Sequence, residues 1–169
     1  MAVIMTYYNQ ISEGYEELHK EEQLKKLRII SRYLKPKKTD LLLDVGCGTG
    51  ITTERWKCIK TGIDPAIKLL KKAKTKKAKE GKNTPYINAE AEHLPFKNSS
   101  FDIVISITAI QNFHNIKKGI AEIKRVGKNK FILTALKKSK NISKIKDLIE
   151  ENFKVKETVE EDKDFIFII

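Results

Sequence analysis

The spacing of apolar and polar residues changes along the chain, and these changes predict an alternation of helices and strands. Residues 21–34 place apolar side chains at the spacing of an amphipathic helix, which Pro36 ends; these are Leu24, Leu27, Ile30 and Leu34. Residues 40–45, "DLLLDV", form an apolar run before a glycine-rich segment. Such a run is typical of a strand that is buried on both faces.

The same alternation continues to the C-terminus. Further strands are expected at residues 58–64, 84–89, 101–107, 130–136, 153–160 and 164–169. Helical patterns separate most of them, at residues 50–56, 66–81, 116–126 and 141–153, with Pro65 and Asn141 suited to helix starts. This order predicts a doubly wound α/β sheet that is parallel at its centre. Only "EDK" joins the last two strands, so they must pair antiparallel.

The chain length fits a single domain over residues 1–169, in which residues 1–36 form a leader and a helix that packs on the core. Cys47 and Cys58 have no paired spacing, which argues against a disulfide scaffold or a zinc finger. We find no signal-peptide pattern and no apolar run of membrane length. These features predict a soluble cytoplasmic protein without a membrane partner.

The formal net charge of +12 favours a polyanionic partner, first of all RNA. Much of the charge is lysine, and seven lysines lie in "KKAKTKKAKEGK" alone, residues 71–82. A lysine run of this kind is also what the solvated face of an ordinary helix carries. Charge therefore favours RNA contact without requiring it.

The strongest chemical signal is the glycine ladder that follows the strand at residues 40–45. "LLLDVGCGTG" places Asp44 before Gly46, Gly48 and Gly50. A dinucleotide fingerprint, G-x-G-x-x-G, would need glycine where Ile51 stands, and no lysine follows as in a nucleoside triphosphatase loop. An acidic side chain would repel a pyrophosphate but suits an ammonium group, so the loop is expected to hold a zwitterion.

Two later acids lie at the ends of the next strands. Asp64 ends the second strand, where a carboxylate can accept hydrogen bonds from ribose hydroxyls. Glu90 follows the third strand, where it can accept from an exocyclic amine while the Ala91 N–H donates to a ring nitrogen. The ordinary alternatives are a helix cap for Asp64 and a surface loop acid for Glu90.

Together these segments resemble the class I S-adenosylmethionine-dependent methyltransferases of the type 11-like group. The resemblance rests on "LLLDVGCGTG", "GIDPA", "AEAEHLPFKNSSFDIVIS" and "EIKRVGKNKFIL", the last with a shortened loop before the fifth strand. It implies a Rossmann-like seven-stranded sheet of order 3-2-1-4-5-7-6, with strand 7 antiparallel and helices on both faces. It also implies S-adenosylmethionine as the cofactor, bound by Asp44, Gly46, Cys47, Gly48, Gly50, Asp64, Glu90, Ala91, Ile107 and Tyr15.

The segment after the fourth strand, "SITAIQNFHN", is expected to face the methyl acceptor. It lacks the N/D-P-P-Y/F motif of adenine-N6 and glutamine-amide enzymes, and "ISITAIQNF" is similar to a stretch of ribosomal RNA guanine-N7 methyltransferases. Guanine N7 needs no deprotonation, so alignment can supply much of the rate. Gln111 and Asn112 can hydrogen-bond a base edge, Phe113 can stack on it, and His114 can act as a base for a hydroxyl acceptor.

Three functions remain open on this basis. The first is a methyltransferase acting on ribosomal or transfer RNA, and the second is a small-molecule or protein methyltransferase. The third is a non-catalytic cofactor-binding subunit of a heterodimer. The leader "YYNQISEGYEELHKEEQ" is expected to place Tyr8 and Tyr15 over the cofactor or to anchor itself by them. The resemblance also implies a small zinc-binding activator protein as a partner.

Overall fold

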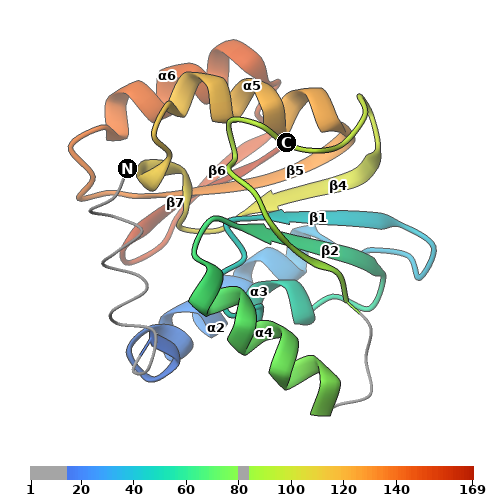
Figure 1. The fold of residues 1–169 in the computed structure, drawn as a ribbon. Helices are drawn as coiled ribbons and strands as arrows, with labels where there is room; N and C mark the ends of the chain where they lie inside the picture. Colours follow the sequence, from blue (N-terminus) through green and yellow to red (C-terminus); the bar gives the residue numbers. More distant parts are fainter. Residues whose placement is uncertain (1–14, 80–83) are drawn as a thin grey trace.

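The computed structural model describes residues 15–79 and 84–169, apart from the side chains of residues 15–20 and 77–79. A single seven-stranded sheet runs through these residues in the order β3-β2-β1-β4-β5-β7-β6 (Figure 1). Its strands are β1 (Leu41–Val45), β2 (Ile59–Asp64), β3 (Tyr86–Asn88), β4 (Phe101–Ser106), β5 (Gly127–Leu136), β6 (Glu157–Glu160) and β7 (Asp164–Ile168). The first five are parallel, and β7 runs antiparallel to both of its neighbours. The expected strand order and the expected antiparallel strand are both confirmed.

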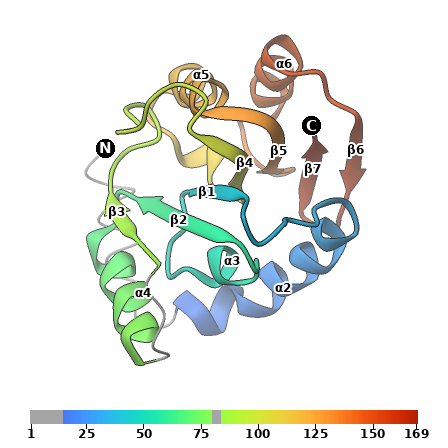
Figure 2. The same cartoon turned by 90° about the vertical axis from the view of Figure 1, so that its right-hand side faces the viewer.

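Helices cover both faces of the sheet (Figure 2). One face carries α2 (Tyr15–Tyr33), α3 (Ile51–Glu54) and α4 (Ile67–Lys79). The other carries α5 (Ile116–Val126), α6 (Ile142–Asn152) and the short 3-10 helix η2 (Ile110–Asn112). Burial of apolar area against the sheet is the main force that holds these layers together.

Each face has its own apolar core. The α5 and α6 side packs Ile120, Ile123 and Ile145 against inward residues of β4, β5 and β7. The α2 side packs Leu27 and Ile30 against the opposite faces of the same strands. Because both faces are covered, the central strands β1 and β4 are mostly apolar, as the run at the start of β1 predicts.

The buried face of α2 differs from the expected one in its N-terminal half. Leu27, Ile30 and Leu34 are buried as expected, but Leu24 is partly exposed. Gln23 and Lys26 are buried in its place, and Lys26 has no exposed surface at all. The apolar spacing therefore located the helix correctly but misplaced its inner face by about one residue.

Two other segments differ from their predictions in length. The helix expected at residues 50–56 is only the four-residue α3. Between α5 and β5, by contrast, no loop remains: Gly127 caps α5 and is the first residue of β5. A side chain at Gly127 would collide with the rings and methyl groups of Phe131 and Val104, which explains why glycine makes this junction.

Candidate cofactor and acceptor site

A cleft opens at the carboxyl ends of β1, β2, β3 and β4. Its empty volume, including space open to solvent, is about 930 Å³. The lining residues come from four loops that are far apart in sequence: Gly46; Ile63, Asp64, Pro65, Ala66 and Leu69; Ala89, Ala91, Glu90 and Glu92; and Ile107, Thr108, Ala109, Asn112, Phe113 and His114. In a sheet of this kind, ligands bind at this edge, where the strand order reverses.

The three glycines of the ladder have different surroundings. All three have positive φ, at 80° for Gly46, 54° for Gly48 and 80° for Gly50, a conformation that favours glycine. Only Gly46 lines the cleft, where a side chain would collide with Ala109. At Gly50 a side chain would collide with the ring of Tyr86 instead. The ladder therefore serves both the cleft and the packing behind it.

Asp64 links the cleft to the glycine loop. It is almost fully buried, its Oδ2 accepts from the Gly48 N–H at 2.9 Å, and its Oδ1 accepts from the Ala66 N–H at 2.7 Å. Burial raises the pKa of Asp64 to about 6, although the two backbone N–H groups lower it. Each carboxylate oxygen has two lone pairs, so the side chain can hold the loop and still accept from a ligand in the cleft.

Asp44 lies behind the glycine loop, outside the lining of the cleft. Its Oδ2 accepts from the hydroxyls of Thr52 at 2.6 Å and Thr53 at 2.7 Å. Its Oδ1 is buried without a hydrogen-bond partner among the described residues. Burial raises the pKa of Asp44 to about 6, although the two hydroxyls lower it. A buried carboxylate oxygen without a partner is rare, and at Asp44 it lies behind the lining of the cleft rather than on it.

Replacing Asp44 with asparagine is expected to change how stability depends on pH. The carboxyl titrates near 3.8 when unfolded and near 6 when folded. Its contribution to stability is thus fully present below pH 3.8 and is lost as the pH rises through 6, by on the order of 3 kcal/mol. Asparagine does not titrate, so the unfolding free energy of Asp44→Asn should rise relative to wild type between pH 4 and 7. Denaturant unfolding at several pH values measures this, and a constant difference would contradict it.

The far end of the cleft is acidic. Glu90 is half-buried and Ala91 is buried, and both line the cleft as expected for an adenine edge. Glu92 also lines it and is buried, with its Oε1 accepting from the Asn115 N–H at 2.8 Å. Sequence reasoning missed Glu92; it lies two residues beyond Glu90 and joins this rim to the loop after β4.

The segment between β4 and α5, residues 107–115, closes the other side of the cleft; we call it the β4–α5 loop. Ile107, Asn112 and His114 line the cleft, together with Phe113. Gln111 does not: its Nε2 donates to the Thr108 carbonyl at 2.7 Å, and its Oε1 is buried without a partner among the described residues. The structure therefore brings two of the three expected acceptor residues to the cleft.

Three other expected cofactor residues, Cys47, Gly48 and Gly50, lie apart from the lining. Cys47 is buried against Gly62, and burial raises the pKa of its thiol well above the usual value. Gly48 and Gly50 lie behind Gly46, as described above. Tyr15 begins α2, but its side chain lies outside the described residues, as does all of Tyr8.

The comparison with known families decides what kind of cleft this is. The methyltransferase domain family matches residues 43–133, more than half of the chain, including the carboxyl ends of the four strands that build the cleft. The chain belongs to the methyltransferase domain family. This membership confirms the resemblance to class I methyltransferases, and S-adenosylmethionine is the methyl donor of that class.

Relatives of this methyltransferase domain come from archaea and bacteria. It is 36% identical over 158 residues to an uncharacterized protein of Methanocaldococcus jannaschii, MJ1252, covering 89% of this chain and 59% of that protein. It is 31% identical over 129 residues to the malonyl-[acyl-carrier protein] O-methyltransferase of Hamiltonella defensa, covering 73% of this chain and 47% of that protein. The chain thus spans less than two thirds of these relatives.

Solved structures share the fold at lower identity. A SAM-dependent methyltransferase from Aquifex aeolicus superposes with a TM-score of 0.72 at 19% identity, covering 83% of this chain and 86% of that one. A putative methyltransferase of Haloferax volcanii, solved in complex with the Trm112 methyltransferase activator, superposes with a TM-score of 0.66 at 16% identity, covering 78% and 59%. At these identities the likeness concerns the fold.

Proposed function

We propose that this methyltransferase domain binds S-adenosylmethionine in the cleft and transfers its methyl group to RNA. The observation that carries the methyltransferase assignment is the cleft itself, in which Gly46, Asp64 and Glu90 from three strand ends face one cavity. The observation that favours RNA is the positive formal charge of the chain, +12. Among the described helices, none is long and apolar enough to cross a membrane.

The cofactor placement follows from the surroundings of each group. The negative charge of Asp44 would favour the ammonium group from behind the glycine loop, while the Gly46 backbone can approach the methionine part closely because it has no side chain. Asp64 suits the ribose hydroxyls, and Glu90 with Ala91 suits the adenine edge. When bound, S-adenosylmethionine would supply a methyl group on a positively charged sulfonium; as a nucleophile bonds to that methyl carbon, the carbon–sulfur bond would break and a neutral thioether would leave.

The β4–α5 loop would hold the acceptor. Asn112 and His114 place polar groups on the cleft, and Phe113 places an aromatic ring there. This set suits a planar base that is held by its edge and face, such as guanine N7, whose lone pair needs orientation rather than deprotonation. Gln111 would act through the loop, since its amide donates to the Thr108 carbonyl.

Basic side chains extend from the loop along the start of α5. His114 is exposed on the lining of the cleft, and Lys117 and Lys118 are exposed three and four residues later. Lys118 Nζ also contacts the ring of His93, which follows the acidic rim residue Glu92. Phosphates of an RNA chain that enters the cleft would pass these groups. Such contacts weaken as the salt concentration rises, because the release of counterions from RNA then contributes less to binding.

The test is incubation of the protein with methyl-labelled cofactor and total RNA from cells that lack the gene, followed by nucleoside mass spectrometry. We expect one labelled nucleoside, with initial rates that fall steeply as salt rises. Lys117→Glu should raise the KM for RNA about tenfold. Lys124→Glu, at the other end of α5 and equally exposed, should leave it unchanged.

Label in products other than RNA would identify a different methyl acceptor. The similarity to a malonyl-[acyl-carrier protein] O-methyltransferase favours a carboxylate on a carried acyl chain as the second candidate acceptor. Label in an acyl-carrier fraction with none in RNA would support that candidate and contradict the RNA proposal. Tight cofactor binding without transfer to RNA, protein or small molecules would instead indicate a cofactor-binding subunit.

A small zinc-binding activator protein is the partner that fits this proposal. One structure that shares the fold is of a putative methyltransferase in complex with the Trm112 activator. Co-expression with such an activator should then yield a stable complex with higher transfer rates. Full activity of the chain alone, unchanged by the activator, would show that no such partner is needed.

A further inference from the structure

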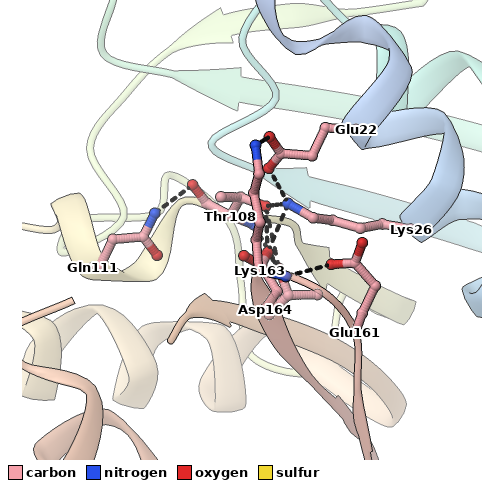
Figure 3. Close-up of polar contacts among 8 residues, drawn as sticks. Glu22, Lys26, Thr108, Gln111, Glu161, Lys163 and Asp164 are labelled. Atoms are coloured by element: carbon pink, nitrogen blue, oxygen red, sulfur yellow. Dashed lines mark hydrogen bonds and ion pairs between the residues drawn. The ribbon is translucent and has the colours of Figure 1, made fainter. Parts of the chain in front are cut away.

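A buried charged cluster joins α2, β7 and the β4–α5 loop behind the cleft (Figure 3). Its centre is Lys26, whose side chain is fully buried. The Lys26 Nζ lies 2.7 Å from Glu22 Oε1, 2.8 Å from Thr108 Oγ1 and 2.9 Å from Asp164 Oδ2. Asp164 is also fully buried. An ammonium group has three N–H donors, so these three acceptors satisfy it completely.

Thr108 is held in this cluster through both its side chain and its backbone. Its hydroxyl accepts from Lys26 and donates to Asp164 Oδ2 at 2.7 Å. Its backbone N–H donates to the hydroxyl of Thr134 on β5 at 2.7 Å, and that hydroxyl donates to the same Asp164 oxygen at 3.1 Å. Every donor in this chain of contacts thus has an acceptor, and all of them converge on Lys26 and Asp164.

The backbone of Thr108 needs such support. Its φ is 55°, in the left-handed region, and a β-branched residue is an outlier there. Strained backbone of this kind persists only when its surroundings over-determine it, and it is concentrated at functional sites. The cluster supplies that over-determination on the side of Thr108 that faces away from the cleft.

The strained residue lies between two residues that shape the cleft. Ile107 before it and Ala109 after it both line the cavity, and Ala109 packs against the position of Gly46. The Thr108 carbonyl accepts from Gln111 and so fixes the next turn of the loop, from which Asn112 points to the cleft. Rotation of Thr108 out of the left-handed region would move all of these groups.

We propose that Lys26, Asp164 and the Thr108 hydroxyl form a positioning network that fixes the β4–α5 loop in the geometry needed for methyl transfer, and that the Lys26–Asp164 ion pair contacts neither cofactor nor acceptor. The network gives α2 a role in the reaction, because Lys26 of α2 is the only buried cation of the network among the described residues. The part of this proposal that concerns methyl transfer rests on the proposed function. The part that concerns loop conformation does not.

The test compares Thr108→Val with wild type in three measurements. Valine keeps the branched shape and leaves the Lys26–Asp164 ion pair in place, but it removes the hydroxyl that joins them to the loop. We expect amide hydrogen exchange in residues 107–113 to become at least tenfold faster, with β1 and β2 unchanged. Cofactor affinity, measured by calorimetry, should change less than threefold, while kcat at saturating cofactor falls at least tenfold.

Lys163→Met is the matched control, because it removes the exposed ion pair between Lys163 and Glu22 at the edge of the same cluster. It should leave exchange, affinity and kcat as in wild type. Asp164→Asn retains an acceptor oxygen and should give an intermediate increase in loop exchange.

Unchanged exchange in the loop of Thr108→Val would overturn the proposal, as would an equal increase throughout the sheet, which would indicate a purely structural role. A wild-type protein that binds cofactor but methylates nothing would refute the proposed function. The exchange comparison would still decide the conformational role of the network.

Discussion

Replacing Lys26 with methionine is expected to lower the free energy of unfolding by about 3–5 kcal/mol. Methionine fills nearly the same volume, so little packing is lost. The change instead leaves Asp164 fully buried without its cation. An uncompensated buried charge costs far more than a missing surface ion pair, and denaturant unfolding followed by circular dichroism measures the difference.

The neighbouring lysine provides a matched control. The Lys25 side chain is 55% exposed, and its Nζ lies 3.9 Å from Glu21 Oε1. Lys25→Met therefore removes only a surface ion pair and should lower the free energy of unfolding by less than about 1 kcal/mol. If the two variants unfold at the same denaturant concentration, the burial assigned to Lys26 is wrong. Combining Lys26→Met with Asp164→Leu removes both buried charges and should recover part of the lost stability.

Replacing Asp64 with alanine is expected to weaken cofactor binding at least a hundredfold. The change removes the carboxylate that faces the cleft and leaves the N–H groups of Gly48 and Ala66 without their acceptor. Hydrogen bonds to a charged group contribute about 1.5–3 kcal/mol each, and two of them to ribose hydroxyls account for that factor. Isothermal titration with S-adenosylmethionine measures the loss.

Two further variants separate the causes of that loss. Asp102 also accepts from a backbone N–H, that of Leu41, but lies at the amino end of β4, away from the cleft. Asp102→Ala should therefore keep the wild-type affinity. Asp64→Asn retains one acceptor oxygen for the loop and should bind more tightly than Asp64→Ala. Unchanged affinity of Asp64→Ala would refute the ribose assignment.

The fold could be predicted almost entirely from apolar periodicity. The central strands are mostly apolar. The three residues between β6 and β7 leave room only for a hairpin, so the antiparallel strand could be expected. The short α3 could not be, because its four residues carry too little pattern to show where a helix ends. The burial of Lys26 could not be predicted either, since lysine in a helix usually indicates solvent and its partner lies 138 positions away.

Residues of the site could be predicted where their position at the end of a strand places them at the cleft. Asp64, Glu90 and Ala91 end or follow their strands, so their side of the sheet follows from the topology. Gln111 was expected in the cleft, but its side-chain direction depends on the left-handed turn at Thr108, for which the sequence carries no glycine signal. After a strained turn, the number of residues that separates a side chain from a sequence motif therefore does not predict the direction in which that side chain points.

The direct passage from α5 into β5 at Gly127 limits how the cleft can open. With no connecting residues to act as a hinge, helix and strand must shift as one body, and the β4–α5 loop is tied to that body by the contact between Thr108 and Thr134. The opposite rim, at Pro65 and Leu69, lies at the start of α4, and the Pro65 carbonyl there accepts from the Asn88 side chain on β3 at 3.0 Å. We therefore expect the wall of the cleft that the β4–α5 loop forms to stay in place as ligands enter and leave.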